Sequence, residues 1–371
     1  MAAELLGRID VDAETGIAGS GAVSMRRIAE AARHGRIAEV NRRLGMRVQE
    51  TMTTSDFTHL ADLTDRGVMK GYLDEVIPIT FDKIGYRRDT SDLARAGGKG
   101  RGRDYELNAP KLIPQVLEKG EYRPIDPAET YFEFKTYKYG CQWDLSWEAW
   151  LADNRDLGIL GDYPNTWGLS ARYTQEYLFT AAYAANATMF TGAHGNLAEA
   201  GSALAAGTLA TGLAALRNFT DPSGNTAVYG GPVFLVVPPA LEITARQLVD
   251  PSWLLANQVT ISSSDAQMLR SCTPVVAPFL PVIDTTNGNT SWYLFCEPRL
   301  RPAVRYGYLR GYTEPEVWIK DSDAQRLASG MSDPFDGSFL TDDIAFKLRF
   351  TFGADTADWR GAYRATGEAA D

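Results

Sequence analysis

The amino-acid sequence predicts an α+β protein, in which a body of strands and helices carries a projecting hairpin and an N-terminal arm. Apolar side chains recur at three- and four-residue spacing from Trp167 to Ala185, as on one face of a helix. They alternate with other side chains from Asp343 to Phe352, as in a strand with one buried face. A third stretch, Glu129–Leu145, predicts a strand that is much longer than the usual length of about five or six residues. Such a strand is typical of an arm that projects beyond a globular body.

Residues 1–75 predict a basic, helical arm. Between Ser24 and Val48 seven arginines stand against two glutamates, although the whole chain has a net charge of −10. An imperfect apolar stripe runs through the same segment. Two interpretations stay open: a solvated surface helix, or an arm that docks on an acidic partner, another subunit or nucleic acid. The arginines are Arg26, Arg27, Arg33, Arg36, Arg42, Arg43 and Arg47.

Val76–Thr80 predicts a short strand that leads into a glycine-rich basic stretch, Arg95–Arg103. Four glycines within seven residues leave the backbone few constraints, so we expect a mobile loop tip that carries positive charge. A phosphate-binding loop would need Ser or Thr after its lysine, and here Gly100 follows Lys99. The cations of this loop tip are Arg95, Lys99, Arg101 and Arg103.

The long strand Glu129–Leu145 changes phase near Thr136. Phe132 and Phe134 occupy even positions, whereas the large apolar residues from Tyr137 onward occupy odd ones. Because strand side chains alternate with a period of two, this change predicts a bulge or bend at Thr136.

The rest of the body is predicted as a series of helices and strands. Ser146–Trp150 predicts a short helix or turn, and a long helix opens at Tyr163. Residues 203–218 predict an alanine-rich helix, and a buried strand at Pro232–Pro238 precedes a helix that begins with proline at Pro239–Leu248. Further strands are predicted at Pro274–Ile283, Ser291–Cys296, Ala303–Leu309, Glu316–Lys320 and Asp343–Phe352.

Composition and charge narrow the class of protein. With 44% hydrophobic and 23% charged residues, the chain can bury a sizeable core. Its acidic balance argues against a surface that embraces nucleic acid on all sides. Three cysteines without CxxC spacing and three dispersed histidines predict no disulfide framework, metal site or cofactor. The charge-free stretches Tyr177–Leu197 and Ala200–Leu216 are too rich in small and polar residues for membrane spans, and no targeting segment is visible.

The search for a catalytic site finds no GxSxG, HExxH or GxGxxG motif. Three carboxylates lie close in sequence to tryptophans: Asp144, Glu148 and Asp153. A carbohydrate-binding cleft with paired catalytic carboxylates therefore stays an alternative interpretation. Cys141 lies in the middle of the long strand, and we expect a small core residue there rather than a nucleophile.

Four passages together carry a resemblance to a known family. They are Cys141–Trp150, the long helix that follows, the strand–Pro-Pro–helix passage Gly231–Ala245, and a C-terminal series from Ser291–Phe295 through Gly311–Glu316 to Asp343–Gly353 and Asp358–Gly361. In their order and spacing they resemble the major capsid proteins of tailed bacteriophages, with the HK-ninety-seven-type shell fold, and in particular the Mu-like head-subunit branch. The likeness covers residues 76–366.

The resemblance implies a structural protein, not an enzyme, that assembles into pentamers and hexamers of an icosahedral shell around double-stranded DNA. It would lie in the virion, and in the host cytoplasm during assembly. The implied parts are an N-terminal arm (1–75), an extended loop with flanking strands (76–145), a peripheral domain with a long spine helix (146–199), an axial domain (200–302) and a return to the peripheral domain (303–371).

The resemblance also implies partners. These are copies of the chain itself, scaffold, portal and decoration proteins, and packaged DNA that is contacted weakly and non-specifically; no membrane is implied. The loop-tip cations would contact an acidic patch on a neighbouring subunit. The arm arginines would contact a neighbour, with scaffold and DNA as the other choices.

Two departures and three alternatives qualify this interpretation. The cleavable scaffolding segment of some relatives looks absent or very short, so a separate scaffold protein is expected. Lys83, Lys99 and Lys111 lie in or near the loop without an identified Asn and Glu partner, so no covalent cross-link is predicted. The alternatives are an encapsulin-like compartment that encloses cargo enzyme, a carbohydrate-active enzyme, and a tail or decoration protein.

Overall fold

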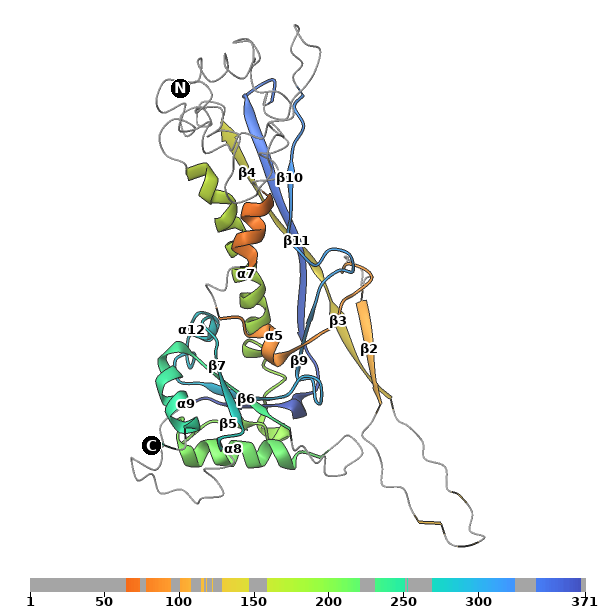
Figure 1. Ribbon diagram of the computed structural model, residues 1–371. Helices are drawn as coiled ribbons and strands as arrows, with labels where there is room; N and C mark the ends of the chain where they lie inside the picture. The colour runs from red at the N-terminus through yellow and green to blue at the C-terminus, as the bar shows by residue number, and fades with distance from the viewer. Residues whose placement is uncertain are drawn as a thin grey trace, which may run out of the picture. The chain divides into compact units, whose positions relative to one another are not determined.

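The structure is a computed structural model that describes residues 65–73, 78–94, 101–107, 115–116, 118, 122, 129–146, 159–220, 231–250, 252, 269–323 and 338–367. The chain divides into two compact units. One contains residues 1–71, 141–167 and 317–348, and the other contains residues 72–140, 168–316 and 349–371. The described segments contain both helices and runs of consecutive strands, such as β8 to β11 (Figure 1), which confirms the predicted α+β class.

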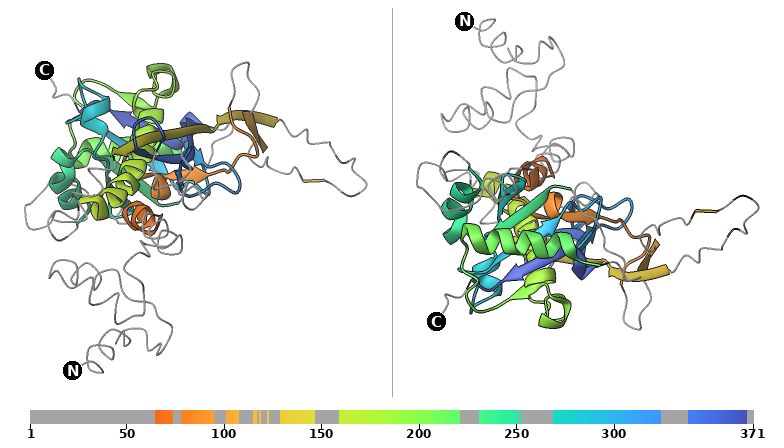
Figure 2. Two further views of the ribbon diagram at one scale, coloured as in Figure 1. Left: turned by 90° about the horizontal axis from the view of Figure 1, so that it is seen from above. Right: turned by 90° about the horizontal axis from the view of Figure 1, so that it is seen from below.

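One sheet of the larger unit has five strands in the order β5-β12-β8-β6-β7. β6 pairs with β7 in parallel and with β8 antiparallel, and β12 joins β8 antiparallel and β5 in parallel. The helix α8 lies against this sheet (Figure 2), where Leu209, Leu213 and Leu216 are buried in one cluster with the strand side chains. The bounds are β5 (Leu197–Ala198), α8 (Ala206–Asn218), β6 (Val233–Val237), β7 (Cys272–Val276), β8 (Trp292–Cys296) and β12 (Ala362–Ala365).

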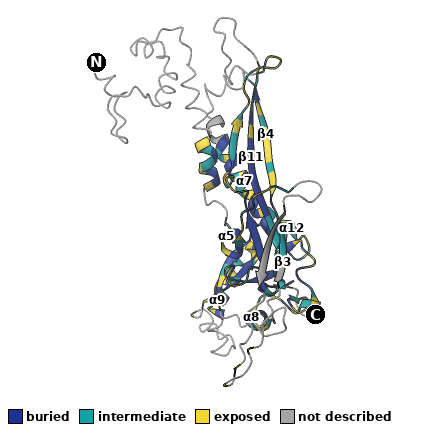
Figure 3. Ribbon diagram, turned by 90° about the vertical axis from the view of Figure 1, so that its right-hand side faces the viewer, coloured by how far each residue is buried: buried dark blue, intermediate teal, exposed yellow. Residues whose placement is uncertain are grey.

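A second sheet has the strand order β1-β9-β11-β10, and β4 also pairs with β11. In β11 the predicted alternation is confirmed, because Phe346, Leu348 and Phe350 are buried on the same side of the strand. β11 is largely buried, whereas β4 is largely exposed (Figure 3). The bounds are β1 (Gly85–Arg87), β4 (Tyr137–Ser146), β9 (Val304–Gly307), β10 (Glu316–Ile319) and β11 (Asp343–Thr356).

The predicted long helix is α7 (Ile159–Ala184), which begins before Tyr163. Tyr183 contacts Tyr293 and Phe295 of β8, with ring centroids 5.3 and 5.1 Å apart. The alternate residues of β8, Trp292 and Leu294, belong to the cluster that contains α8. Because both faces of β8 are covered, its five residues form a continuous apolar run rather than an alternating one.

The long strand predicted at Glu129–Leu145 is two strands, β3 (Glu129–Lys135) and β4, separated at Thr136. This confirms the predicted break. β3 pairs antiparallel with β2 (Arg101–Leu107), and these two strands form a separate two-stranded sheet, called here the β2–β3 ribbon.

Two predicted strands are wrong in part. Residues 78–80 have no regular structure and lead into the short helix α5 (Phe81–Ile84), while residues 76–77 lie outside the described part. In the predicted strand Pro274–Ile283, β7 ends at Val276, and Leu280–Ile283 form the helical turn α12 with proline in its first turn.

The strand β12 was not predicted from the sequence. The predicted helix Pro239–Leu248 is a 3₁₀ turn η2 (Pro239–Leu241) followed by α9 (Glu242–Val249).

Candidate functional site

The predicted basic loop tip is placed differently by the structure. Arg101 and Arg103 lie in β2, opposite Lys135 and Glu133 of β3, so they begin the β2–β3 ribbon instead of capping its turn. The connection between the two strands comprises residues 108–128. The expectation of a tip at Arg95–Arg103 is therefore wrong for these two arginines, because Gly102 between them pairs in extended conformation with Phe134 of β3.

The other predicted contact residues lie outside the described part of the chain. These are Arg95 and Lys99 of the loop, and Arg26, Arg27, Arg33, Arg36, Arg42 and Arg43 of the arm. Their contact roles stay predictions.

The base of the β2–β3 ribbon is held at the buried residue Thr136. The Thr90 hydroxyl donates to the Thr136 hydroxyl oxygen at 2.9 Å, and the Ala94 nitrogen donates to the Thr136 carbonyl oxygen at 2.9 Å. A Cβ added at Gly353 of β11 would lie only 2.1 Å from the Lys135 carbonyl oxygen. This close backbone approach fixes the point at which β3 leaves the body and β4 joins β11.

A buried carboxylate ties α7 to the segment before α5. Glu176 accepts a hydrogen bond from the Thr80 nitrogen at 3.0 Å and another from the Thr80 hydroxyl, which is shorter. Burial raises the pKa of Glu176 to about 7, although the bonds from Thr80 and Phe81 and the charge of Arg172 act in the opposite direction. The sequence offers one signal for this contact, a lone glutamate at the start of a charge-free stretch, but no signal for its partner.

Arg172 strengthens the same junction one turn earlier in α7. Its guanidinium lies over the rings of Tyr72 and Phe81, 4.9 Å from each centroid, and 3.9 Å from the Asp82 carboxylate. The Tyr72 hydroxyl donates to Gln175 Oε1 at 3.1 Å. Three polar residues of α7, namely Arg172, Gln175 and Glu176, therefore hold residues 72–82.

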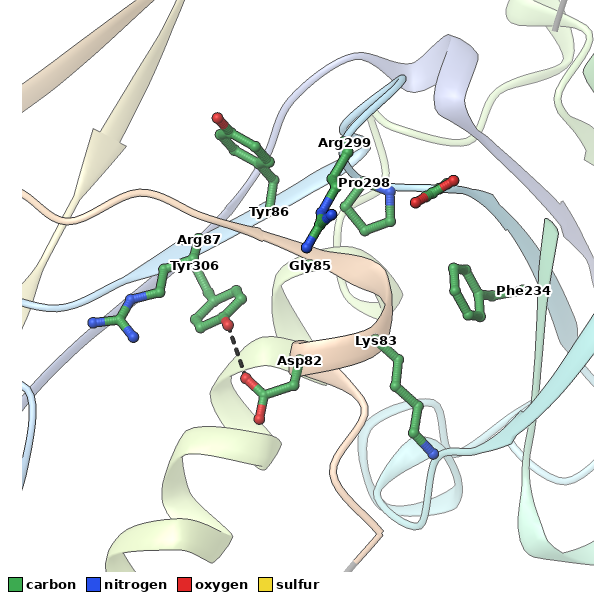
Figure 4. A pocket seen from close by; sticks show the side chains of 10 residues that line it. Asp82, Lys83, Gly85, Tyr86, Arg87, Phe234, Pro298, Arg299 and Tyr306 are labelled. Atoms are coloured by element: carbon green, nitrogen blue, oxygen red, sulfur yellow. Dashed lines mark hydrogen bonds between the residues drawn. The ribbon is translucent and has the colours of Figure 1, made fainter. Parts of the chain in front are cut away.

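A pocket with a volume of about 590 Å³ opens beside α5 and β1 (Figure 4). The Tyr306 hydroxyl donates to Asp82 Oδ1 at 2.8 Å on one side, and Lys83, Arg299 and Phe234 lie around the opening. Because the carboxylates of Asp82 and Glu297 lie beside these cations, the lining has both signs of charge and indicates no single class of ligand. The lining residues are Asp82, Lys83, Gly85, Tyr86, Arg87, Phe234, Glu297, Pro298, Arg299 and Tyr306.

Two of the residues considered for catalysis, Cys141 and Asp144, lie on β4 in the described part of the chain. Cys141 is exposed on β4, so the expectation of a core residue is wrong; partial desolvation raises the pKa of its thiol, which disfavours the thiolate. Asp144 is exposed and accepts a hydrogen bond from Gln142 at 2.9 Å. Glu148 and Asp153 lie outside the described residues.

The described segments contain neither a metal-binding cluster nor a helix that could cross a membrane. No cluster of three His, Cys, Asp or Glu side chains there is arranged to hold a metal ion. None of the described helices combines the length and the apolar character needed to cross a bilayer.

Several solved structures are similar to the chain at low sequence identity. The head structure of Helicobacter pylori bacteriophage KHP40 has 10% sequence identity and a TM-score of 0.48, over 79% of this chain and 92% of that one. The capsid of Ralstonia phage GP4 has 9% identity and a TM-score of 0.49, over 79% and 92%. A virus-like particle from Pyrococcus furiosus has 11% identity and a TM-score of 0.43, over 82% and 98%. No curated protein sequence matches the chain.

The family assignment rests on a sequence model rather than on these distant structures. The model described as phage capsid protein matches residues 130–365, which is more than half of the 371 residues. This range contains β3, the break at Thr136, α7 and nearly all of both five-stranded sheets. It favours a capsid protein over the other functions considered. On this evidence the chain belongs to the phage capsid protein family and is a major structural protein of the phage head.

Proposed function

We propose that this chain assembles with copies of itself into pentamers and hexamers of a closed icosahedral shell around double-stranded DNA. The observation that carries the proposal is the β2–β3 ribbon, which pairs with neither five-stranded sheet. Its base packs on the chain's own body, where Phe134 is buried and Arg305 lies over the Phe132 ring, but further out Tyr131 is 55% exposed. A two-stranded ribbon that the body covers only at its base is marginally stable in water. A ribbon of this kind is stabilised when a neighbouring subunit covers it, as a shell provides.

The role we infer is mechanical, without catalysis. Closed symmetry repeats each contact around the shell, so contacts that are individually weak sum to a stable assembly. The net charge of −10 would repel packaged DNA, which lets the genome slide during filling. Scaffold, portal and decoration proteins are the further partners of this proposal.

The cations at the base of the ribbon would bind an acidic patch on the next subunit. Arg101 and Arg103 begin β2, and Arg95 and Lys99 precede it in sequence. Because the chain as a whole is acidic, a basic segment finds opposite charge on a copy of the same chain. The arm arginines would act in the same way, with a neighbouring subunit as their first partner.

The domain assignment belongs to the same proposal. Residues 200–302 would cluster around the five- and six-fold axes. They supply α8, β6, β7 and β8, whose side chains share one buried core, which makes a compact body suited to packing around an axis.

Negative-stain microscopy and sedimentation of the purified protein, alone and with its neighbouring scaffold gene product, test the assembly. We expect closed shells, or rings of five and six subunits. A protein that stays monomeric under both conditions would overturn the proposal.

A second experiment tests the basic contact. Replacing Arg95, Lys99, Arg101 and Arg103 with Ser is expected to reduce shell yield. The matched control replaces four exposed cations elsewhere with Ser, and thus changes the net charge equally: Lys70, Lys138, Arg246 and Lys320. Equal shell yield from the two variants would contradict a specific contact.

A further inference from the structure

The part of α7 that lies in the larger unit exposes two aromatic side chains. Its buried face carries Gln175 and Glu176, which bond to residues 72–81. Its exposed face carries Tyr173 and Tyr177, whose exposed fractions are 45% and 41%. The buried face also carries Phe179 and Tyr183, as expected of a surface helix, but the aromatic rings on the exposed face are unusual for one.

The helical turn α12 extends this exposed face. Phe279, just before α12, contacts Tyr173 and Tyr177 edge-on, with centroid distances of 5.7 and 5.9 Å. Val282 of α12 is 63% exposed. These four residues form what we call the tyrosine patch, and aromatic side chains of this kind are enriched in interfaces between proteins.

The tyrosine patch carries no charge of its own. Between Gly168 and Ala184 the charged residues are Arg172 and Glu176, and both are turned toward residues 72–82. At the end of α12, Asp284 is paired with Arg364 at 2.7 Å. A nucleic acid would require cations on this face, so the patch does not suit packaged DNA.

The charge of the chain argues that the patch meets a second copy. Each chain has a net charge of −10, so two copies repel each other over most of their surfaces. A charge-free patch of aromatic side chains can face its own copy without repulsion, and tyrosine is among the residues that contribute most to interfaces. A contact between identical patches is the arrangement found across a two-fold axis.

The size of the patch indicates where this contact forms. Four partly exposed side chains cover far less than the roughly 800 Å² per partner of a stable interface. The contact would therefore not hold two free subunits together, but it would add to the other contacts within a shell.

We propose that the tyrosine patches of two copies pack against each other across two-fold axes of the shell. This inference rests on the proposed assembly and adds the surface that mediates one of its contacts. Tyr173 and Tyr177 are the central residues of the contact, and Phe279 supports them from the same chain.

A charge-pairing experiment tests the two-fold contact. Chains with Tyr177→Asp place two like charges opposite each other, and so do chains with Tyr177→Lys; each is expected to give at least tenfold fewer shells than wild type. Mixed in equal amounts, the two variants are expected to recover shell yield, because Asp then faces Lys. The control pair, Leu340→Asp and Leu340→Lys, changes a residue that is 88% exposed and lies outside residues 200–302, and it is expected to assemble as wild type does.

A cross-linking experiment on assembled shells gives an independent measurement. In a Cys141→Ser background, Tyr177→Cys or Tyr173→Cys is expected to form disulfide-linked dimers on oxidation within shells, but not in free subunits. Shells without such dimers, or variants that do not rescue each other, would overturn the inference while the assembly itself stands. Protection of the introduced thiol in free subunits would also overturn it, since the chain's own arm would then cover the patch. A wild-type chain that forms no shells would instead reject the proposed assembly.

Discussion

The carboxylate of Glu176 accepts hydrogen bonds from both the backbone nitrogen and the hydroxyl of Thr80, although the two residues are 96 positions apart in the chain. Both residues are buried. The contact attaches α7 to the segment that leads through α5 and β1 toward the β2–β3 ribbon. A change in the charge of Glu176 therefore acts on the segment from which the ribbon extends.

The stability of the subunit is expected to fall as the pH rises through neutrality. Burial raises the pKa of Glu176 from its ordinary 4.5 to about 7, so the folded chain binds this proton more tightly than the unfolded chain does. The resulting stabilisation is fully present below about pH 4.5 and is lost as the pH rises through about 7. At about 1.4 kcal/mol per pKa unit, the effect is at most about 3.5 kcal/mol.

Urea unfolding of wild type and Glu176→Gln from pH 4.5 to about pH 8 measures this effect. The neutral variant is expected to lack this component of the pH dependence, whereas Glu314→Gln, at an exposed carboxylate, is expected to keep it. Parallel pH profiles for wild type and Glu176→Gln would contradict the assignment.

Thr80→Val is expected to destabilise the subunit by about 1–3 kcal/mol, because it removes a donor from a buried carboxylate while it keeps the side-chain shape. The loss is expected to be larger at pH 8 than at pH 5, since the missing bond favours the charged form. Thermal unfolding at the two pH values measures it. Thr211→Val on the exposed side of α8 is the control, and an equal loss there would show that Thr80 has no special role.

Gly353→Ala is expected to destabilise the junction between β3 and β4 by about 1–3 kcal/mol, as overpacking does. The added Cβ would lie 2.1 Å from the Lys135 carbonyl oxygen, and both groups belong to the backbone, so neither can rotate away. Hydrogen exchange at the Ala94 nitrogen, which bonds to Thr136, is expected to accelerate. Unchanged exchange there, together with unchanged thermal stability, would show that the junction tolerates a side chain.

Two glycines of α8 are expected to respond oppositely to alanine. Gly212→Ala would bring a Cβ to 2.9 Å from Tyr363 and 3.2 Å from Leu294, and we expect a loss of about 1–3 kcal/mol. Gly207→Ala meets no atom within 4 Å and is expected to stabilise the helix by about 0.5–1 kcal/mol. Thermal unfolding of the two variants provides the comparison, and a loss at both positions would show that the close contacts of Gly212 are not the cause.

The predicted helices and strands that the structure confirmed depend on the local periodicity of apolar side chains. The break at Thr136 was visible because the apolar side chains change from even to odd positions, and a strand cannot place both sets on one face without an irregularity. The same local signal located α7, α8 and β11. The prediction that Cys141 is a core residue was wrong, because Cys141 is exposed. The alternation of side chains indicates on which side of a strand a residue lies, but it does not indicate whether another element covers that side.

The sequence by itself determined the α+β class, the main helices and strands, the absence of the common catalytic motifs and the resemblance to phage capsid proteins, because each depends on neighbouring residues or on the order of short motifs. Only the tertiary structure decided the rest. It joined Thr80 to Glu176 and so excluded a strand at residues 78–80, placed β12 beside β8, moved Arg101 and Arg103 into a paired strand, and left the tyrosines of α7 exposed. Those outcomes depend on contacts between residues far apart in the chain, where the burial of a charge or a ring is set by a partner that local sequence does not encode.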